Sequence, residues 1–213
     1  MKKTMFALLA AGAALLPAGQ ASADQTPAAL REIYDAGRCI VDNDRRTAVS
    51  YLQSLPLEEG EADLTQLPDS LSRRCARGLS TVDSLHVRGA IAQALFFRDF
   101  GGFGIEPGRS VPLVNLNIPA QSSPPGTGMT ELYRWADCVV RNDIGHTERL
   151  LQSRVGSQSE SAAIEQLRPY MQACAGAESL AVRSSDFRSL AAQSAYNSMY
   201  RYWTRQLDPV RDQ

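Results

Sequence analysis

Cysteine is the residue type in this chain whose spacing is most informative about chemistry. The four cysteines are Cys39, Cys75, Cys138 and Cys174, and the two cysteines in each half of the chain are 36 positions apart. Four cysteines permit three disulfide pairings. No Cys-x-x-Cys motif is present, and no histidine is close enough in sequence to activate a thiol. The spacing therefore favours structural disulfides over a redox or nucleophilic cysteine.

The remaining candidates for metal binding or catalysis do not complete a pattern. His86 and His146 are the two histidines, which leaves too few ligands for a zinc site once the cysteines are paired. Residues 42–44 (Asp-Asn-Asp) resemble the start of a calcium loop, but the glycine and the bidentate glutamate of such a loop do not follow. The glutamates of residues 58–61 lie in a polar connection without a matching cluster elsewhere. The sequence also lacks the GxSxG and HExxH motifs of hydrolases, so we expect no metal and no cofactor.

One polar pattern occurs twice on a helix that we expect to be buried. Arg88 is followed by Gln93, and Arg188 is followed by Gln193 at the same spacing. One interpretation is structural, with each arginine held inside its own unit by a carboxylate or by the C-terminus of a helix. The alternative is a pair of related anion-binding sites, which makes these four residues the candidate binding residues.

An internal duplication explains why these residues recur. A shift of 99 positions superimposes Tyr34 on Tyr133, both cysteine pairs on each other, and the Asn43-Asp44 pair on Asn142-Asp143. After a one-residue insertion, the arginine and glutamine also coincide. We interpret the chain as two copies of a unit of about 70 residues. If both copies adopt one fold, the disulfides must be Cys39–Cys75 and Cys138–Cys174, because only this pairing lies within each copy.

Apolar residues at helical spacing predict four amphipathic helices in each copy, and hence an all-α protein of two tandem four-helix units. Asp44 and Asp143 follow the first helix of their copies and suit the N-cap of the second. Pro68 and Pro169 fall in the third helix of each copy, which should therefore begin late or kink there. The aromatic residues Tyr196, Tyr200 and Trp203 share one face of the last helix, and we expect core packing or a contact between the copies.

The copies should occupy residues 24–100 and 129–213, joined by a connection rich in glycine and proline at residues 101–128. We expect no helix in this connection. Its centre, residues 111–118, is apolar enough to lie across a groove between the copies. A connection of this length without its own structure is uncommon, so residues 101–128 are a candidate recognition element.

The N-terminus and the composition indicate where the protein acts. Lys2 and Lys3, an apolar run over residues 5–17 and the small residues 21–23 have the order of a secretory signal peptide that spans residues 1–23. The rest of the chain has no stretch apolar and long enough for stable membrane insertion. A formal net charge of −1 gives no reason to expect nucleic acid as a partner. These features predict a periplasmic or secreted protein.

The two-cysteine unit resembles a group of known sequences. Residues 138–140 (Cys-Val-Val) lead through an Asn-Asp pair to Leu150-Leu151, and Cys174 precedes the helix over residues 187–196. This pattern resembles uncharacterised exported bacterial proteins with a duplicated two-cysteine helical unit. The resemblance implies an exported compartment and an all-helical fold, and no activity.

The sequence leaves enzymatic activity open and favours a binding function over a hydrolytic one. Small helical repeats present binding surfaces without catalytic residues. We therefore expect a non-catalytic binding or protein-interaction module of the bacterial cell envelope, with an envelope protein or peptide as its partner. The alternative is an envelope hydrolase acting on cell-wall material through an unrecognised site, for which His86 or His146 should meet carboxylates in a cleft.

Overall fold

The structure is a computed structural model, and it describes residues 26–54, 64–77, 79, 82–111, 129–175 and 182–207. These residues form eight α-helices and two short 3-10 helices and include no strand, as the sequence predicted. The elements are α1 (Pro27–Asn43), α2 (Arg45–Ser54), η1 (Leu64–Gln66), α3 (Asp69–Cys75), α4 (Ser84–Phe100), η2 (Glu106–Ser110), α5 (Met129–Asn142), α6 (Ile144–Gln152), α7 (Gln158–Ala175) and α8 (Ser184–Leu207).

The duplicated aspartates begin the second helix of each copy, as predicted. One carboxylate oxygen of Asp44 accepts the Thr47 backbone N–H at 3.0 Å, and Asp143 accepts the His146 N–H at the same distance. Such bonds satisfy donors that the first turn of a helix leaves without an intrahelical acceptor. Hydrogen bonds from Thr47 also hold the pKa of Asp44 below its usual value. Asp44 therefore serves the start of α2.

The third helix differs between the copies. In the first copy Pro68 directly precedes α3, so this helix begins late, as predicted. In the second copy α7 runs from Gln158 through Ala175 with Pro169 inside it, so of the two expected alternatives, a late start and a kink, the late start does not occur there. A proline inside a helix removes one backbone hydrogen bond. The Cys138–Cys174 disulfide joins α7 to α5 near the end of α7, and α7 also packs on α5 and α6.

The prediction of no helix in the connection is also corrected over its described part, residues 101–111. Residues Glu106–Ser110 form the 3-10 helix η2, in which Pro107 occupies an early position that does not require its missing N–H. This turn packs on α8 so closely that a Cβ on Gly108 would lie 3.0 Å from Ser198. The rest of the connection, including residues 112–118 that we expected to cross a groove, lies outside the described residues.

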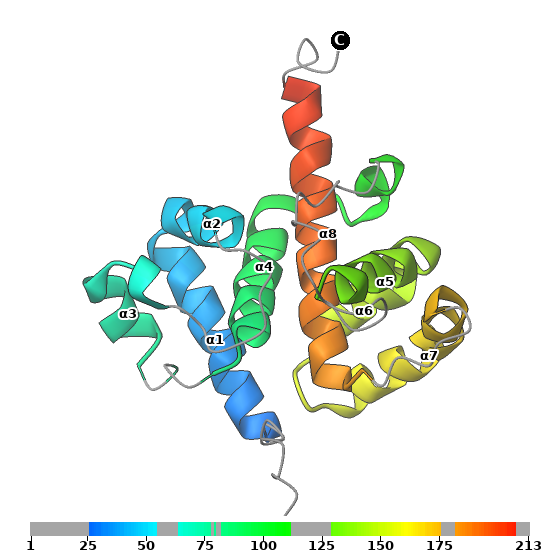
Figure 1. Cartoon of the computed structure of the whole chain (residues 1–213), viewed down its shortest axis with the longest axis horizontal. Helices are drawn as coiled ribbons and strands as arrows, with labels where there is room; N and C mark the ends of the chain where they lie inside the picture. The colour runs from blue at the N-terminus through cyan, green and yellow to red at the C-terminus, as the bar shows by residue number, and fades with distance from the viewer. Residues whose placement is uncertain are drawn as a thin grey trace, which may run out of the picture.

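The two copies meet through their last helices, α4 and α8, which run side by side in the same direction (Figure 1). Equivalent positions face each other, because a Cβ on Gly89 would lie 2.5 Å from the Cα of Ser189, and His86 lies beside Asp186. Glycine at position 89 is what permits this close approach. The copies are thus related by an approximate twofold axis that runs along the α4–α8 pair.

The apolar interior is continuous across both copies. One cluster of buried residues includes side chains from every α-helix, with Ile40, Ile91, Val139 and Leu190 each at most 1% exposed. Helix α4 packs on α1 as well as on α8, and a Cβ on Gly37 would lie 2.6 Å from the backbone of Ala90. The four-helix units therefore share a core.

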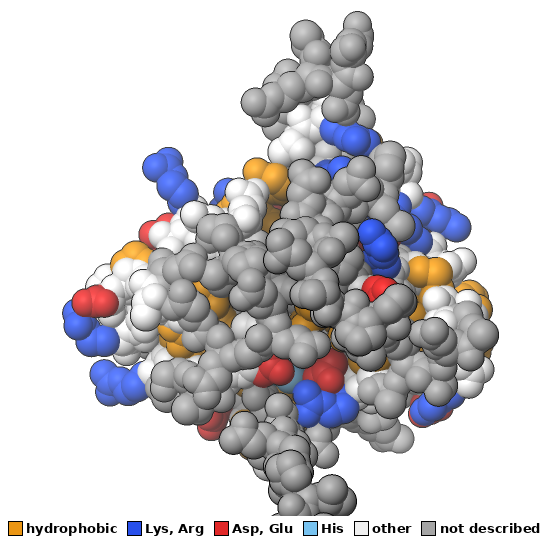
Figure 2. Space-filling view, in the orientation of Figure 1, with side chains coloured by type: hydrophobic (Ala, Val, Ile, Leu, Met, Phe, Trp, Pro, Cys, Tyr) orange, Lys and Arg blue, Asp and Glu red, His pale blue; other side chains and the backbone are white. Residues whose placement is uncertain are grey.

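Charged side chains of the described residues lie at several separate places on the face seen in Figure 2. Arginine side chains project separately from the edges of both units, with acidic side chains between several of them. None of the helices among the described residues has the length and apolar character needed to cross a bilayer.

Candidate functional site

The disulfides are those that the duplication predicted. Cys39 on α1 is bonded to Cys75 on α3, and Cys138 on α5 is bonded to Cys174 on α7. No free cysteine is present among the described residues, so thiol chemistry is not available from this part of the chain.

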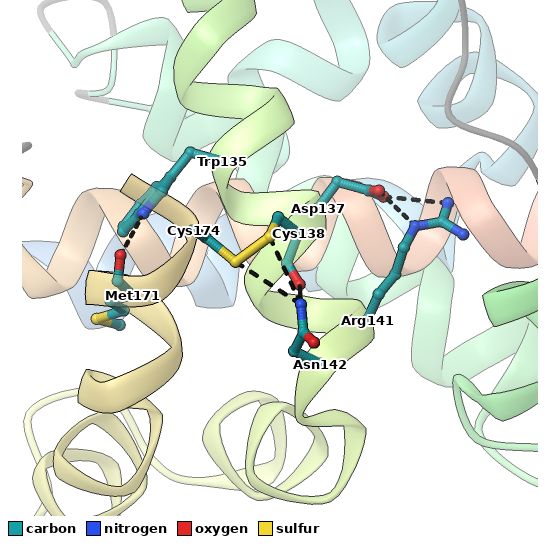
Figure 3. Close-up of a disulfide and its surroundings, with 7 residues drawn as sticks. All are labelled: Trp135, Asp137, Cys138, Arg141, Asn142, Met171 and Cys174. Atoms are coloured by element: carbon teal, nitrogen blue, oxygen red, sulfur yellow. Dashed lines mark hydrogen bonds and ion pairs between the residues drawn. A yellow bond between two sulfur atoms is a disulfide. The ribbon is translucent and has the colours of Figure 1, made fainter. Parts of the chain in front are cut away.

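Hydrogen bonds of α5 residues surround the Cys138–Cys174 disulfide (Figure 3). Asn142 donates to the carbonyl oxygen of Cys138 at 2.9 Å, and Asn43 makes the same contact with Cys39 in the first copy. The indole N–H of Trp135 donates to the carbonyl oxygen of Met171 at 2.9 Å, which is a second link between α5 and α7. The duplicated asparagine is therefore part of the structural setting of each disulfide.

The four candidate binding residues come together on the α4–α8 pair. Nε of Arg88 donates to the side-chain oxygen of Gln193 at 3.2 Å, and Nε of Arg188 donates to that of Gln93 at 3.1 Å. Each arginine thus bonds the glutamine of the other copy. The structural interpretation expected each arginine to be held within its own unit, and it did not include these bonds between the copies.

Each arginine also bonds within its own copy, close to the C-terminus of the second helix. Arg88 donates to the carbonyl oxygen of Leu52 at 2.8 Å, and Arg188 donates to that of Leu151 at 3.1 Å. Arg188 further donates to Ser153 and to a carboxylate oxygen of Glu160, the latter at 2.8 Å. With its side chain only 1% exposed, Arg188 has protein acceptors on all three guanidinium nitrogens. This geometry agrees with a structural role, and anion binding by Arg88, Gln93, Arg188 and Gln193 stays a prediction.

Two duplicated tyrosines complete this polar layer. The hydroxyl of Tyr34 lies 3.1 Å from that of Ser189, and the hydroxyl of Tyr133 donates to the side-chain oxygen of Gln193. Burial raises the pKa of Tyr34, and burial raises the pKa of Tyr133 to about 12. The Tyr34 ring also lies 5.1 Å from the guanidinium carbon of Arg188, within cation–π range. Both tyrosines therefore link the first helix of a copy to α8.

Glu160 is a member of this network that the sequence reasoning missed. Its two carboxylate oxygens accept from Arg188 and from the backbone N–H of Gly156. The signal was present, because the 99-residue shift places Glu160 opposite Glu61. The interpretation of residues 58–61 as a solvated loop without a counterpart overlooked this match; those residues lie outside the described part of the chain.

Both histidines lie in the first turn of a helix. His146 on α6 lies 2.7 Å from the capping carboxylate of Asp143. His86 on α4 is buried, with Nε2 lying 3.2 Å from Asp186 on α8. Burial opposes ionisation of Asp186, but bonds to His86 and Arg183 outweigh it and lower the pKa of this carboxyl.

A pocket of about 410 Å³ opens between the two copies, and Arg188 forms part of its lining. Its lining comes from the start of α1, the turn between α6 and α7, and the first turns of α7 and α8. The lining residues are Pro27, Leu30, Tyr34, Val155, Gly156, Glu160, Arg183, Ser184, Ser185 and Arg188. The volume lies near the lower end of the roughly 300–1,000 Å³ typical of small-molecule sites. Neither histidine lines this pocket, so the histidine–carboxylate cleft expected for a hydrolase is not formed there.

The aromatic residues at the end of α8 take part in packing between the copies, as expected. Tyr196 is buried, and its ring lies 5.9 Å from that of Phe100 on α4. Burial raises the pKa of the Tyr196 hydroxyl. Trp203 packs edge-on against Phe103, which is 58% exposed, so this cluster reaches the surface at the end of the α4–α8 pair.

Two further findings bear on function. Within the described ranges, no group of three or more histidine, cysteine or acidic side chains is arranged to hold a metal ion. Comparison of the chain with protein families, with curated proteins and with solved structures found no match. The pocket between the copies is therefore the candidate functional site on its geometry alone.

Proposed function

We propose that this chain is a non-catalytic binding module of the bacterial cell envelope and that it holds its ligand in the pocket between its two helical units. The observation that carries the proposal is the origin of the lining. Leu30 and Tyr34 come from the first unit, whereas Val155, Glu160 and Ser185 come from the second. A pocket of this kind exists only when both copies are assembled, and interfaces between domains are common places for ligand sites.

The envelope location is supported by two features. The first 23 residues have the order of a secretory signal peptide. Both cysteine pairs are oxidised, and disulfides persist in oxidising compartments such as the periplasm.

The rigidity of the surrounding elements also supports a binding role. Glu160 links the α6–α7 turn to α8 through Arg188, and a Cβ on Gly156 would lie 2.7 Å from the side chain of Pro27 on α1. Gly156 has a φ of +71°, a conformation that other residues rarely adopt. The walls of the pocket are therefore fixed before a ligand arrives, which reduces the entropic cost of binding.

The proposal is tested by photo-crosslinking in the exported protein. p-Benzoylphenylalanine is placed at position 185, which lines the pocket, and in a second variant at position 170, where Tyr170 is 37% exposed and not part of the lining. Irradiation of intact cells should give a discrete adduct from position 185 that position 170 does not give. Mass spectrometry of the purified protein then identifies the attached molecule. The absence of an adduct at position 185, or the same adducts at both positions, would overturn the proposal.

A further inference from the structure

The pocket between the copies has an apolar wall. Pro27 and Leu30 lie in the first turn of α1, Val155 lies in the turn between α6 and α7, and the ring of Tyr34 adds to the same wall. These groups attract the apolar part of a ligand through the hydrophobic effect. The volume of about 410 Å³ exceeds twice the roughly 150 Å³ of an apolar cavity that holds benzene, so there is room for about twelve carbon atoms.

The charged side chains that line the pocket are paired within the protein. All three guanidinium nitrogens of Arg188 donate to protein oxygens, and Nη1 lies 2.8 Å from Glu160. The other carboxylate oxygen of Glu160 accepts from the backbone N–H of Gly156. Arg183, the third charged residue of the lining, donates through Nε to Asp186 at 2.8 Å. Each charged side chain of the lining therefore has an opposite charge beside it.

A charged ligand would have to compete with these ion pairs. Its charge would displace a bond of a buried group and leave that group unpaired, or it would lose water without gaining a partner. Both outcomes cost free energy, and the argument applies equally to an anion and to a cation. The hydroxyl of Tyr34 is engaged as well, because it lies 3.1 Å from that of Ser189. The lining therefore favours an uncharged ligand.

Polar contact without charge is available at the start of α8. Ser184 and Ser185 line the pocket there, and Ser185 is half-buried. The Ser185 hydroxyl lies 3.4 Å from a carboxylate oxygen of Asp186, which is longer than the usual O–H···O hydrogen bond. A serine hydroxyl can both donate and accept a hydrogen bond. It therefore suits a neutral polar group of a ligand, such as an alcohol.

We infer that the pocket takes an uncharged aliphatic molecule that bears a hydroxyl group, with the chain against Leu30 and Val155 and the hydroxyl at Ser185. This inference rests on the proposed binding function and names the ligand class for it. The apolar wall supplies affinity for the chain, and the serine supplies a partner for the hydroxyl. The ion pairs of the lining supply the selectivity, because they exclude acids and amines of the same chain length.

Calorimetry on the full mature chain tests the ligand class with three probes of equal chain length. Octanol, octanoate and octylammonium differ in the charge of one end group. We expect octanol to bind roughly tenfold or more tightly than either ion at neutral pH, because each ion must lose water without a free partner in the lining. Equal affinities, tighter binding of either ion, or no binding of any probe would overturn the ligand class. If the crosslink at position 185 still captured a molecule in that case, the binding function would stand without it.

Breaking one ion pair of the lining should change the selectivity. In Glu160→Gln the charge of Arg188 loses its compensating carboxylate, so octanoate should gain about tenfold or more in affinity relative to octanol. The matched control is Glu165→Gln, which breaks the exposed pair with Arg168 outside the lining and should leave the ratio unchanged. Circular dichroism confirms that each variant is folded. An unchanged ratio in folded Glu160→Gln would show that the ion pairs do not set the selectivity.

Serine variants locate the hydroxyl of the ligand. Ser185→Ala should weaken octanol binding by about fivefold, which is the typical value of one neutral hydrogen bond. The control is Ser161→Ala on α7, whose exposed hydroxyl also makes a 3.4 Å contact and does not line the pocket, and which should bind octanol like the natural chain. Unchanged octanol affinity in Ser185→Ala would overturn the placement of the hydroxyl at this serine.

Discussion

At the scale of single residues, the buried arginines show how a repeated polar pattern can arise from packing. Arg188 is 1% exposed, and its donors reach acceptors on α4, on α7 and in the segment that follows α6. A guanidinium in such a place must be paired, because a buried charge without partners is strongly unfavourable. Duplication therefore preserved Arg88 and Arg188 together with the glutamines that accept from them. The sequence could indicate that the arginine and the glutamine of each copy lie on the same helix, but it could not identify an acceptor in the other copy.

Replacing Arg188 by methionine should destabilise the protein by about 3–5 kcal/mol, the range for breaking one side of a buried ion pair, because Glu160 would then be buried without its partner. Urea unfolding at neutral pH measures this change. The matched control is Arg168→Met, which removes an ion pair with Glu165 whose side chains are 58% and 60% exposed, and which should change stability by less than about 1 kcal/mol. Adding Glu160→Gln to Arg188→Met should restore part of the loss. Equal effects of the two arginine substitutions would show that the Arg188 pair does not matter for stability.

At the scale of helices, the duplication predicted most of what each element does. The apolar periodicity, the capping aspartates and the two disulfides were all readable from equivalent positions, because each depends on residues within a single copy. The packing of α4 on α8 was not readable, since an apolar face indicates burial and does not specify the partner. The 3-10 helix at Glu106–Ser110 was also missed, because its contacts with α8 outweigh the local preferences of glycine and proline. At Pro169 the sequence left a late start or a kink open, and it could not choose between them.

The close α4–α8 contact predicts that Gly89→Ala destabilises the protein, although replacing glycine by alanine normally stabilises a helix. Alanine at position 89 should destabilise the protein by roughly 1–3 kcal/mol, because its Cβ would lie 2.5 Å from Ser189 and force the helices apart. The control is Gly145→Ala on α6, where the nearest atom to an added Cβ is 3.9 Å away, and where alanine should stabilise by up to about 1 kcal/mol. Thermal unfolding followed by circular dichroism distinguishes the two. Similar changes of the same sign would contradict the close approach of the helices at this point.

The same helix pair should make stability depend on pH in the acid range. The pKa of Asp186 is lower in the folded protein than in the unfolded chain, so the folded protein binds fewer protons there. The contribution of this carboxylate to stability is therefore complete above the unfolded pKa of about 4 and is lost as the pH falls toward the folded value. Asp186→Asn should lose less stability between about pH 5 and pH 3 than the natural chain in urea unfolding. Parallel curves for the variant and the natural chain would contradict the assignment.

At the scale of the whole molecule, the two copies are one folding unit. A core without a boundary between the copies, the crossed Arg–Gln bonds and the close packing of α4 on α8 all make the stability of each copy depend on the other. Two independent four-helix domains joined by a connection would each have a separate core. The pocket between the copies should then form and disappear together with the whole fold.

Removing one disulfide tests this dependence, because the two tryptophans, Trp135 and Trp203, both belong to the second copy. In the double variant Cys39→Ser with Cys75→Ser, loss of the cross-link should cost roughly 3–4 kcal/mol under the chain-entropy model. Tryptophan fluorescence reports on the second copy, whereas circular dichroism reports on both. If the core is shared, both signals should show one transition at the same, lower urea concentration. A circular dichroism signal that falls first, while the fluorescence transition stays at its original position, would mean that the first copy unfolds alone and that the pocket is lost before the second copy melts.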